Sequence, residues 1–254
     1  FSGNGDAVVL SVEGTDILLA NDSANAGKGT LIAGTYGNLY VKSTGAWTYE
    51  LGDSTTDHEG IDLTGSADQV QDSFNYSVTD ADADVASSTL TVDINDDGPS
   101  ATNEGLVQVN EGASVNGTLD FVAGADGASI TDINGETPDG EGVITVSNAL
   151  GTLSVTAATG DYTFTATDDA SQVAAQDYTF TVTDGDGDTV TATVSFDSLD
   201  MHEPSASPDT GLVDEEALAD GSNAASTAET DTGTLVFSGN GDAVVLSVEG
   251  TDIL

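Results

Sequence analysis

The sequence contains no cysteine, so no disulfide can cross-link the fold and no thiolate can bind a metal. Its two histidines, His58 and His202, lie far apart in the sequence, and no G-x-S-x-G stretch occurs. A nucleophilic triad and a histidine-based zinc site are therefore disfavoured. Paired carboxylates could hydrolyse glycosides, but here they fall in turns and linkers with few aromatic residues nearby. The chain is predicted not to be an enzyme.

Positive charge is almost absent from the chain. Lysine and arginine together number 2, against 45 aspartates and glutamates, and the formal net charge is −43. A surface this acidic repels nucleic acid and anionic membranes, which excludes both as partners. No apolar run approaches the ~18 residues of a membrane span, so no membrane insertion is predicted. Because carboxylates about 4 Å apart repel by ~1 kcal/mol in water, and by more near a protein surface, a bound cation is expected to compensate.

Helical periodicity is absent, and short alternating runs rich in Val, Thr, Tyr and Phe are separated by Gly, Asp and Asn. Such runs at close spacing are typical of strands in a β-sandwich. The sequence therefore predicts an all-β fold. The clearest strands are expected at residues 38–41, 47–51, 74–79, 89–94, 151–156, 162–166, 178–183 and 189–196.

An exact repeat marks the two ends of the sequence. Residues 1–18, FSGNGDAVVLSVEGTDIL, recur without change as residues 237–254, so the two copies start 236 residues apart. Solenoid units are only ~20–50 residues long, so this period indicates a tandem array of units that each hold whole domains. Neighbouring repeats of the same chain are the first expected partners.

A second, diverged repeat lies within the first. Both of its copies close on Pro-Ser-Ala, which puts module boundaries near 98/99 and 205/206. We therefore predict that residues 1–98 are a module A without its first strand or strands, and that residues 99–205 are a complete module B. Residues 206–254 are predicted to be the N-terminal portion of the next module A. The matching segments are 36–51 with 150–166, 71–84 with 175–188, and 117–129 with 233–245.

The acidic residues cluster at matching places in the two modules, each time as a D-x-D-x-D run between two predicted strands. In an extended segment alternate side chains point the same way, so the three carboxylates of a run share one face. Calcium takes about six to eight oxygen ligands and accepts irregular geometry. A solvated acidic turn is the alternative. We predict Ca²⁺ at both runs, which consist of Asp80, Asp82 and Asp84, and of Asp184, Asp186 and Asp188.

The segment DINDDGPSATNE, residues 93–104, joins the two modules. It fits the calcium-loop pattern D-x-[DN]-x-[DN]-G-x5-E, but Pro99 and the preceding strand residues contradict the helices that normally flank that pattern. We interpret it as a calcium-binding linker on a β scaffold, with a flexible acidic linker as the alternative. Its candidate ligands are Asp93, Asn95, Asp96, Asp97 and Glu104.

The linker after module B, residues 197–204, lacks the Asp97–Gly98 pair and is expected to bind calcium more weakly or to borrow ligands from the next module. Its candidates are Asp197, Asp200, Glu203 and Asp214. In a sandwich the hairpin before the last strand lies at the domain's N-terminal end. The 184–188 run is therefore expected beside the 93–104 linker. Asp126 and Glu111 are further candidates at that same end.

Aromatic residues alternate on the predicted strands and are expected in the core. They are Trp47, Tyr49, Tyr162 and Phe164. Module A also carries insertions at residues 52–68 and 217–232 that module B lacks. A sugar- or surface-binding β-sandwich that uses these insertions is the alternative function.

Together these patterns resemble a known family. The pattern G-x-L-x-V-x-x-x-G-x-Y-x-F, followed by F/Y-x-V-T-D-x-D-x-D and a closing D-D-G-P, is similar to the VCBS and T1SS-143-type repeats of giant bacterial RTX adhesins. DINDDGP also resembles the DxNDN-type linker of cadherins, where calcium stiffens the joint between sandwiches. The resemblance implies tandem Ig-like (cadherin-like) β-sandwich domains with calcium-binding interdomain linkers. It further implies a stalk exported by type I secretion to the bacterial cell surface.

The exact repeat carries one more expectation. Because its two copies lie at the two ends of this chain, both ends are expected to be parts of the same kind of domain, with module B between them. The ends are therefore expected to pair head to tail between neighbouring molecules, with one duplicate segment displaced.

Overall fold

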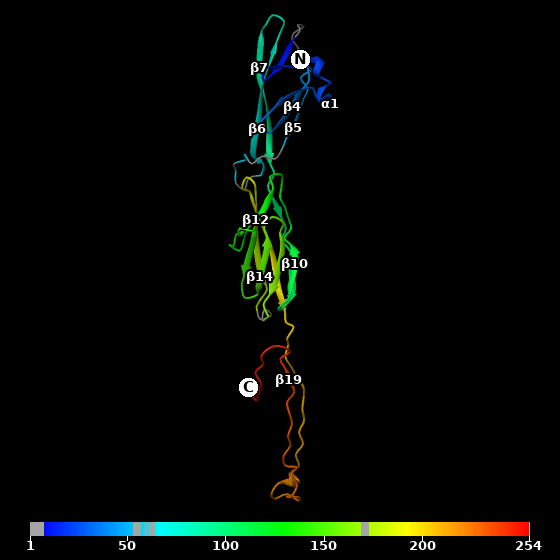
Figure 1. The fold of residues 1–254 in the computed structure, drawn as a ribbon, viewed down its shortest axis with the longest axis vertical. Coiled ribbons are helices and arrows are strands. Elements are labelled where there is room, and N and C mark those ends of the chain that lie inside the picture. The colour runs from blue at the N-terminus through cyan, green and yellow to red at the C-terminus, as the bar shows by residue number, and fades with distance from the viewer. Residues whose placement is uncertain (1–7, 53–56, 59, 61–63, 169–172, 254) are drawn as a thin grey trace.

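A computed structural model describes residues 8–52, 57–58, 60, 64–168 and 173–253. Figure 1 shows an elongated chain in which module B lies between the N-terminal module and the C-terminal segment, residues 206–254. The protein is all-β, as predicted. Within the described ranges the helices are single turns, namely η1 Leu19–Asn21, α1 Ala24–Gly27 and η3 Glu215–Ala217. None of the helices in this part of the chain has the length and apolar character needed to cross a membrane.

Module B is a sandwich of two sheets. One has the strand order β10-β15-β14-β13 and the other β12-β16-β17-β9, and β9 runs parallel to β17. The strands are β9 Leu106–Asn110, β10 Ser114–Thr118, β12 Ala128–Ile133, β13 Val143–Ser147, β14 Gly151–Thr156, β15 Asp161–Ala166, β16 Gln176–Asp184 and β17 Thr189–Leu199.

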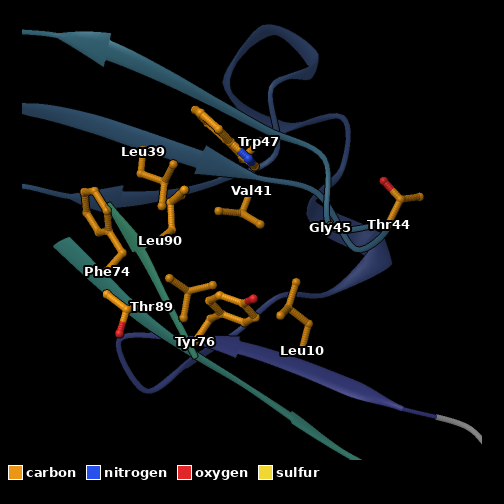
Figure 2. Close-up of a pocket in the computed structure, with 11 residues that line it drawn as sticks. Leu10, Leu39, Val41, Thr44, Gly45, Trp47, Phe74, Tyr76, Thr89 and Leu90 are labelled. Atoms are coloured by element: carbon orange, nitrogen blue, oxygen red, sulfur yellow. The ribbon is translucent and has the colours of Figure 1, made fainter. Parts of the chain in front are cut away.

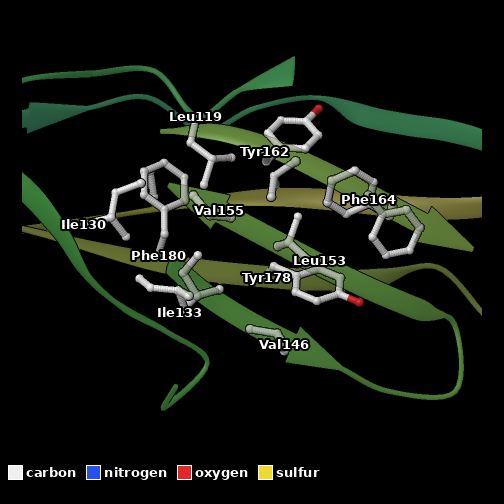
Figure 3. Packing of buried hydrophobic residues seen from close by; sticks show 14 of the residues in the cluster. Leu119, Ile130, Ile133, Val146, Leu153, Val155, Tyr162, Phe164, Tyr178 and Phe180 are labelled. Carbon is white, nitrogen blue, oxygen red and sulfur yellow. The ribbon is translucent and has the colours of Figure 1, made fainter. Parts of the chain in front are cut away.

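The core of module B follows from alternation along these strands. In β15 the residues Tyr162, Phe164 and Ala166 are buried while the threonines between them face solvent. The Phe164 ring stacks on the Phe196 ring with centroids 4.1 Å apart, and Tyr178 meets both rings edge-on (Figure 3). Such aromatic pairs add stability beyond the area they bury.

Module A has two smaller sheets, with strand orders β2-β1-β6-β7 and β3-β4-β5. Its strands are β1 Val9–Val12, β2 Thr15–Asp16, β3 Thr30–Ala33, β4 Gly37–Val41, β5 Trp47–Leu51, β6 Gly65–Thr79 and β7 Val85–Asp96. The β4–β5 and β6–β7 hairpins correspond to β14–β15 and β16–β17, as the internal repeat predicts. All eight predicted strands are confirmed, and β6 and β7 extend well beyond their predicted ends.

The sheets of module A have open edges where those of module B are covered. In module B, β9 pairs with the outer edge of β17 and β10 with that of β15. In the described part of module A, β7 pairs only with β6 and β5 only with β4. The module therefore resembles module B without counterparts of β9 and β10. The exact module boundaries remain a prediction.

The C-terminal segment carries short strands, which are β18 Ser205–Ala206, β19 Phe237–Ser238, β20 Ser247–Val248 and β21 Thr251–Asp252. At its start, Ala206 pairs with Phe237 as Ala101 pairs with Phe121 where module B begins. The latter pair joins β8 Ser100–Ala101 to β11 Phe121–Val122. Both modules thus begin with the same local pairing.

The duplicated sequence adopts the same hairpin twice in two different environments. Val12 pairs with Thr15 in the first copy, and Val248 pairs with Thr251 in the second. The Glu-Gly turn has positive φ at both residues in each copy, as a tight hairpin turn requires. The first copy packs against β6 and Val12 is 3% exposed, whereas Val248 is 45% exposed. Local sequence therefore sets the hairpin, and only a packing partner buries it.

This contrast yields a matched pair of substitutions. We expect Val12→Ala to lower the free energy of unfolding of module A by about 2 kcal/mol, because each buried methylene contributes ~0.8 kcal/mol and a cavity adds to the loss. The same change at the identical position in the second copy, Val248→Ala, should leave the melting temperature of the dilute monomer unchanged. Equal effects of the two changes in thermal melts would contradict the difference in packing.

Candidate metal centre at the module joint

The joint between modules A and B is short and closely packed. Between β7 and β8 only Asp97, Gly98 and Pro99 lie outside strands. The amide of Ala125 donates a hydrogen bond to Asp97 Oδ2 at 3.1 Å. Gly124 has φ +70°, and a Cβ there would lie 2.7 Å from the Asp97 carbonyl oxygen, so only glycine allows this approach. The linker is thus held against a loop of module B.

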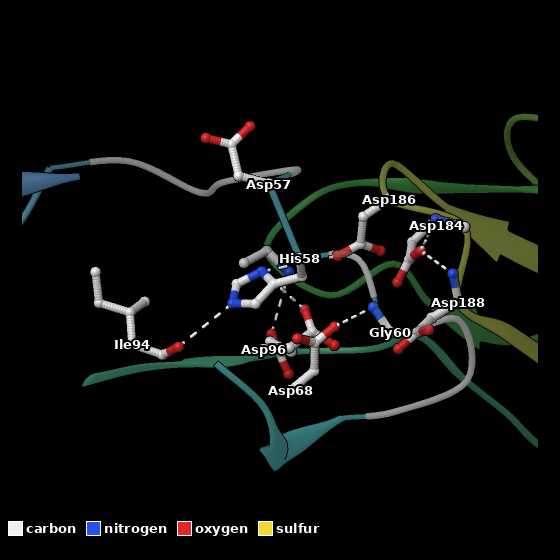
Figure 4. A network of polar contacts seen from close by, with 12 residues as sticks. Asp57, His58, Gly60, Asp68, Ile94, Asp96, Asp184, Asp186 and Asp188 are labelled. Atoms are coloured by element: carbon white, nitrogen blue, oxygen red, sulfur yellow. Dashed lines mark hydrogen bonds and ion pairs between the residues drawn. The ribbon is translucent and has the colours of Figure 1, made fainter. Parts of the chain in front are cut away.

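Four titratable side chains from four separate segments meet at this joint. They are His58, Asp96 at the end of β7, Asp126 and Asp186, and their candidate ligand atoms all lie within 4.8 Å of one another. His58 Nδ1 lies 3.5 Å from Asp96 Oδ1 and 3.8 Å from Asp186 Oδ2 (Figure 4). The side chain of Asp96 is only 1% exposed and that of Asp186 only 3%. Residues of both modules therefore build one buried polar cluster.

The D-x-D-x-D run of module B forms a second group that shares Asp186 with the first. Asp184, Asp186 and Asp188 lie in the β16–β17 turn and also present ligand atoms within 4.8 Å of one another. Asp184 Oδ1 accepts hydrogen bonds from the amides of Gly187 at 3.1 Å and Asp188 at 2.8 Å. These bonds close the turn.

The cluster has too little positive charge. The chain's two basic residues, Lys28 and Lys42, lie in module A, where Lys28 pairs with Glu50. Within the described chain, both carboxylate oxygens of Asp96 and of Asp186 are buried and accept no hydrogen bond. Buried charges in proteins are normally paired or coordinate metals.

Burial and mutual repulsion change the acidity of these groups. Burial, with the neighbouring Asp188 and Asp186 carboxylates, raises the pKa of Asp96 to about 6. Burial and Asp186 likewise raise the pKa of Asp184 to about 6. The pKa of Asp126 is raised by burial and then by Asp186. The folded chain therefore stores electrostatic repulsion at the joint near neutral pH.

Among the predicted linker ligands, Asp96 joins the cluster but Asp93 and Asn95 do not. Side chains alternate along β7, so Asp93 and Asn95 lie on the face opposite to Asp96. They accept hydrogen bonds from the side chains of Gln71 at 2.7 Å and Gln69 at 2.6 Å.

Two further candidates of this linker also have other roles. Asp97 binds the Ala125 amide, and Glu104 accepts a hydrogen bond from the amide of Asp120 at 3.1 Å. These residues, although spaced as in a calcium-loop pattern, therefore do not gather at one point, and calcium binding by the linker as a whole stays a prediction. A loop can direct residues at such spacing to one ion, whereas the strand separates them onto two faces.

The prediction that Glu111 lies beside the 184–188 run is wrong. Because β9 runs parallel to β17, its end lies where module B joins the C-terminal segment. There Glu111 accepts a hydrogen bond from the amide of Met201 at 2.9 Å and lies 2.8 Å from His202 Nδ1. Asp242 completes this group of possible ligands. Glu111 thus marks the second joint rather than the first.

The candidates of the second linker do not gather into a group within the described residues. Asp197 accepts a hydrogen bond from Gln108, and Asp200 from the amide of His202. Glu203 is exposed, and its backbone carbonyl accepts a hydrogen bond from the side chain of Asn240. Asp214 caps η3 by accepting a hydrogen bond from the Glu216 amide at 3.1 Å.

The run of Asp80, Asp82 and Asp84 forms a group at the β6–β7 turn, at the end of module A far from the joint (Figure 1). Its local geometry matches the run in module B, because the amide of Asp84 donates to Asp80 Oδ1 at 2.9 Å. Among the described residues, none from another module joins this group. This is where the joint with a preceding module would lie in an array.

Sequence reasoning disfavoured a histidine-based metal site and did not place His58 at the joint. His58 lies in the insertion at 52–68, part of which is outside the described residues, and its sequence neighbours include no metal-binding pattern. Its position beside Asp96 and Asp186 depends on contacts between segments distant in sequence. A histidine in an insertion specific to module A was the only available signal.

Comparison with known proteins agrees with this architecture. A family model described as a bacterial Ig domain matches residues 95–197, which cover most of module B. No curated protein matches the chain in sequence. The fold is therefore all-β, and module B is an Ig-like domain.

Solved structures with similar chains include the titin I-band fragment I67–I69, at 14% identity and a TM-score of 0.31 over 77% of this chain and 55% of that one. The protocadherin GammaB4 extracellular domain matches at 17% identity and a TM-score of 0.33, over 84% and 37% of the two chains. An endo-fucoidan hydrolase of glycoside hydrolase family 107 matches at 18% identity and a TM-score of 0.25, over 78% and 24%. The chain thus spans about half of the titin fragment and about a third of the protocadherin.

The raised pKa values of Asp96 and Asp184 predict that the stability of the metal-free protein depends on pH. Because the folded-state pKa values of Asp96 and Asp184 are about 6, above the ~3.9 of an unfolded aspartate, the folded chain binds more protons between these values. The stability that protonation provides is complete below pH ~3.9 and is lost as pH rises through about 6. We expect the melting temperature in EDTA to fall between pH 5 and pH 7.

The matched control is the same charge change on the exposed face of β7. Asp96→Asn should reduce the pH dependence of the melting temperature, and Asp93→Asn should not. A metal-free melting temperature that rises across this interval, or equal slopes for the two variants, would contradict the repulsion described here.

Proposed function

We propose that this chain is an extender segment in the stalk of a secreted bacterial surface adhesin, in which calcium at the module joints holds tandem Ig-like domains in line. The observation that carries the proposal is the pair of buried carboxylates, Asp96 and Asp186, that face each other across the joint and accept no hydrogen bond from the described residues. One belongs to module A and the other to module B. The partners in this role are neighbouring repeats of the same chain outside the cell.

The residues at the joint suit calcium. The group Asp184, Asp186 and Asp188 offers carboxylate oxygens only, and hard oxygen ligands are those that calcium prefers. Asp96 and Asp126 lie next to this group and add carboxylates from either side of the linker. A bound divalent cation would supply the positive charge that the joint lacks.

The mechanical consequence follows from the origin of these side chains. Asp96 is fixed by the β6–β7 hairpin of module A, and Asp184 and Asp188 are fixed by the β16–β17 hairpin of module B. When a shared cation compensates the carboxylates, a change in the angle between the modules would separate ligands and cost binding energy. When they are uncompensated, repulsion favours a more open joint. Stiffness of the stalk would therefore depend on extracellular calcium.

Calcium should raise the melting temperature and straighten the chain. A site at a calcium concentration ~100-fold above its Kd adds about 2.7 kcal/mol to the free energy of unfolding. We expect a higher melting temperature in millimolar calcium than in EDTA, and a longer maximum dimension by small-angle X-ray scattering.

The two D-x-D-x-D turns provide the matched control for this experiment. Asp186→Asn should remove most of the calcium response, because Asp186 belongs to both clusters at the joint. Asp82→Asn makes the same change in the corresponding turn, which faces no second module in this chain, and should keep the response at the joint. If neither the melting temperature nor the scattering responds to calcium in the unaltered chain, the proposed function is wrong.

A further inference from the structure

Module A has an open groove where the core of module B is closed. The groove has a volume of about 400 Å³ and is lined by core residues of both sheets, among them Leu39, Phe74 and Trp47 (Figure 2). Trp47 lies on β5, whose outer edge pairs with no other described strand, and is 52% exposed, although its alternation on the strand predicts a core position. The repeat aligns it with Tyr162, which is 8% exposed in module B.

The difference between these two aromatic rings has a single structural cause. In module B, Gly117 of β10 pairs with Tyr162, and a Cβ at Gly117 would lie 2.4 Å from the tyrosine oxygen. Only glycine leaves room for the ring to lie across the strand. Two residues later, Leu119 enters the core and is 1% exposed. Strand β10 thus covers Tyr162 and fills the space that is empty in module A.

The chain carries its own counterpart of β10 in the C-terminal segment. GTLVF at 233–237 matches GTLDF at 117–121, so Gly233 corresponds to Gly117 and Leu235 to Leu119. Leu235 is 52% exposed and no described core covers it. Gly211-Leu212-Val213 likewise matches Gly105-Leu106-Val107, where β9 begins. Leu212 and Val213 are also exposed.

We propose that residues 211–236 of one molecule complete module A of the next, with Gly233 opposite Trp47 and Leu235 in the groove. The segment that begins at Leu212 would then pair as a strand along the free edge of β7, as β9 pairs along β17. Within one molecule module B separates the two parts, which lie at opposite ends of the chain (Figure 1). This inference rests on the proposed tandem array, in which the same segment would precede each module A.

The chain's single tryptophan makes the test direct. We expect the full chain, in calcium and moderate salt, to form concentration-dependent head-to-tail oligomers in sedimentation velocity. Because pairing would cover Trp47, its emission should shift to shorter wavelength and acrylamide quenching should fall in step with association. Gly233→Val places a side chain where the ring would lie and should abolish both effects.

The matched control is Gly105→Val, the same change at a glycine with open space around it, which should associate as the unaltered chain does. A chain that stays monomeric at hundreds of micromolar, or that associates without a change in Trp47 emission, overturns the inference. An emission shift on addition of oligosaccharides without self-association also overturns it and favours the sugar-binding alternative. Because the calcium response is measured at the other joint, its survival would separate these failures from failure of the stalk proposal.

A second inference concerns His58 and rests on contacts other than those of the groove. Its Nε2 lies 3.3 Å from the carbonyl oxygen of Ile94, to which a protonated Nε2 can donate. In that tautomer the lone pair of Nδ1 faces the carboxylates of Asp96 and Asp186. Metal-binding histidines commonly donate their other ring N–H to a backbone carbonyl in this way.

The spacing and chemistry of the four residues suit a small transition-metal ion. A tetrahedral zinc site has bonds of about 2.0–2.2 Å, which place its ligands roughly 3.3–3.6 Å apart. The distances from Nδ1 to the two carboxylates, 3.5 and 3.8 Å, are close to this range. One imidazole with carboxylates suits zinc, whereas calcium takes oxygen ligands.

We infer that His58, Asp96, Asp126 and Asp186 form a site for a zinc-like dication beside the oxygen-only calcium group, with Asp186 shared between them. The inference does not require that the chain be an adhesin. It predicts that the joint between modules A and B binds two kinds of metal ion, one of which millimolar calcium does not displace.

The test uses cobalt as a spectroscopic probe and zinc titration calorimetry, both with the full chain in millimolar calcium. We expect one cobalt equivalent with the intense visible absorption of a tetrahedral ion, displaced by one equivalent of zinc. His58→Gln can keep the hydrogen bond to Ile94 but loses the metal-binding nitrogen, so zinc affinity should fall at least about tenfold.

The matched control is His202→Gln, which removes the other histidine and should leave this site unchanged. Asp96→Asn provides a second variant in the site, and thermal melts in EDTA verify that each variant folds. Equal zinc affinity in the unaltered chain and His58→Gln, or displacement of cobalt by calcium, would refute the inference. Loss of cobalt binding with His202→Gln instead would assign the metal to the second joint.

Discussion

Repulsion between carboxylates that have too little counter-charge is the constraint on which the joints of this chain depend. With 45 acidic and 2 basic residues, ion pairs cannot neutralise the surface, and most carboxylates reduce repulsion by facing solvent. Asp96, Asp184 and Asp186 do the opposite, since they are held together out of water at the joint. An arrangement that raises two carboxyl pKa values to about 6 is costly for a chain that only has to fold. It becomes favourable when a divalent cation is part of the folded state.

The hydrophobic constraint acts at the edges of the sheets. Module B closes its sandwich because β9 and β10 cover the free edges of β17 and β15, and the buried ring of Tyr162 depends on that closure. Module A keeps the same hairpins without the closing strands, so Trp47 stays exposed. The hairpins alone therefore do not determine how well the core is covered. Coverage of the core depends instead on the sequence of the closing strand and on which part of the chain supplies that strand.

Sequence reasoning succeeded where the determinant was local or repeated. Strand periodicity located β14 to β17 closely, because alternate residues face a core and turn residues bound each strand. The internal repeat placed Asp184 and Asp186 in the hairpin turn at the joint. It failed where the determinant was tertiary. Asp93 was misplaced because a loop spacing does not hold on a strand, which sends neighbouring residues to opposite faces.

Glu111 was misplaced, and His58 was not placed at the joint, for the same physical reason. The end of a module at which Glu111 lies depends on β9 running parallel to β17, and no local pattern encodes that pairing. His58 reaches Asp96 and Asp186 only because the insertion that carries it folds against the joint. Contacts between segments distant in sequence have no periodic signature, so a single sequence reveals the acidic runs but not the residues that complete their surroundings.

Carboxylate repulsion and the need to cover sheet edges both act at the module boundaries, so the stability of each module depends on its neighbours. Strand β18 begins the next module by the same pairing with which β8 begins module B. The strands after β18, however, pack against no hydrophobic core among the described residues. In an array, each module A would thus gain closing strands from the segment before it and would share a carboxylate cluster with the module B after it. Stability in such a chain resides in nearest-neighbour interfaces as much as in the units themselves. In the proposed stalk, bending or unfolding one link would then weaken the next, which favours a chain that stays straight or unfolds cooperatively.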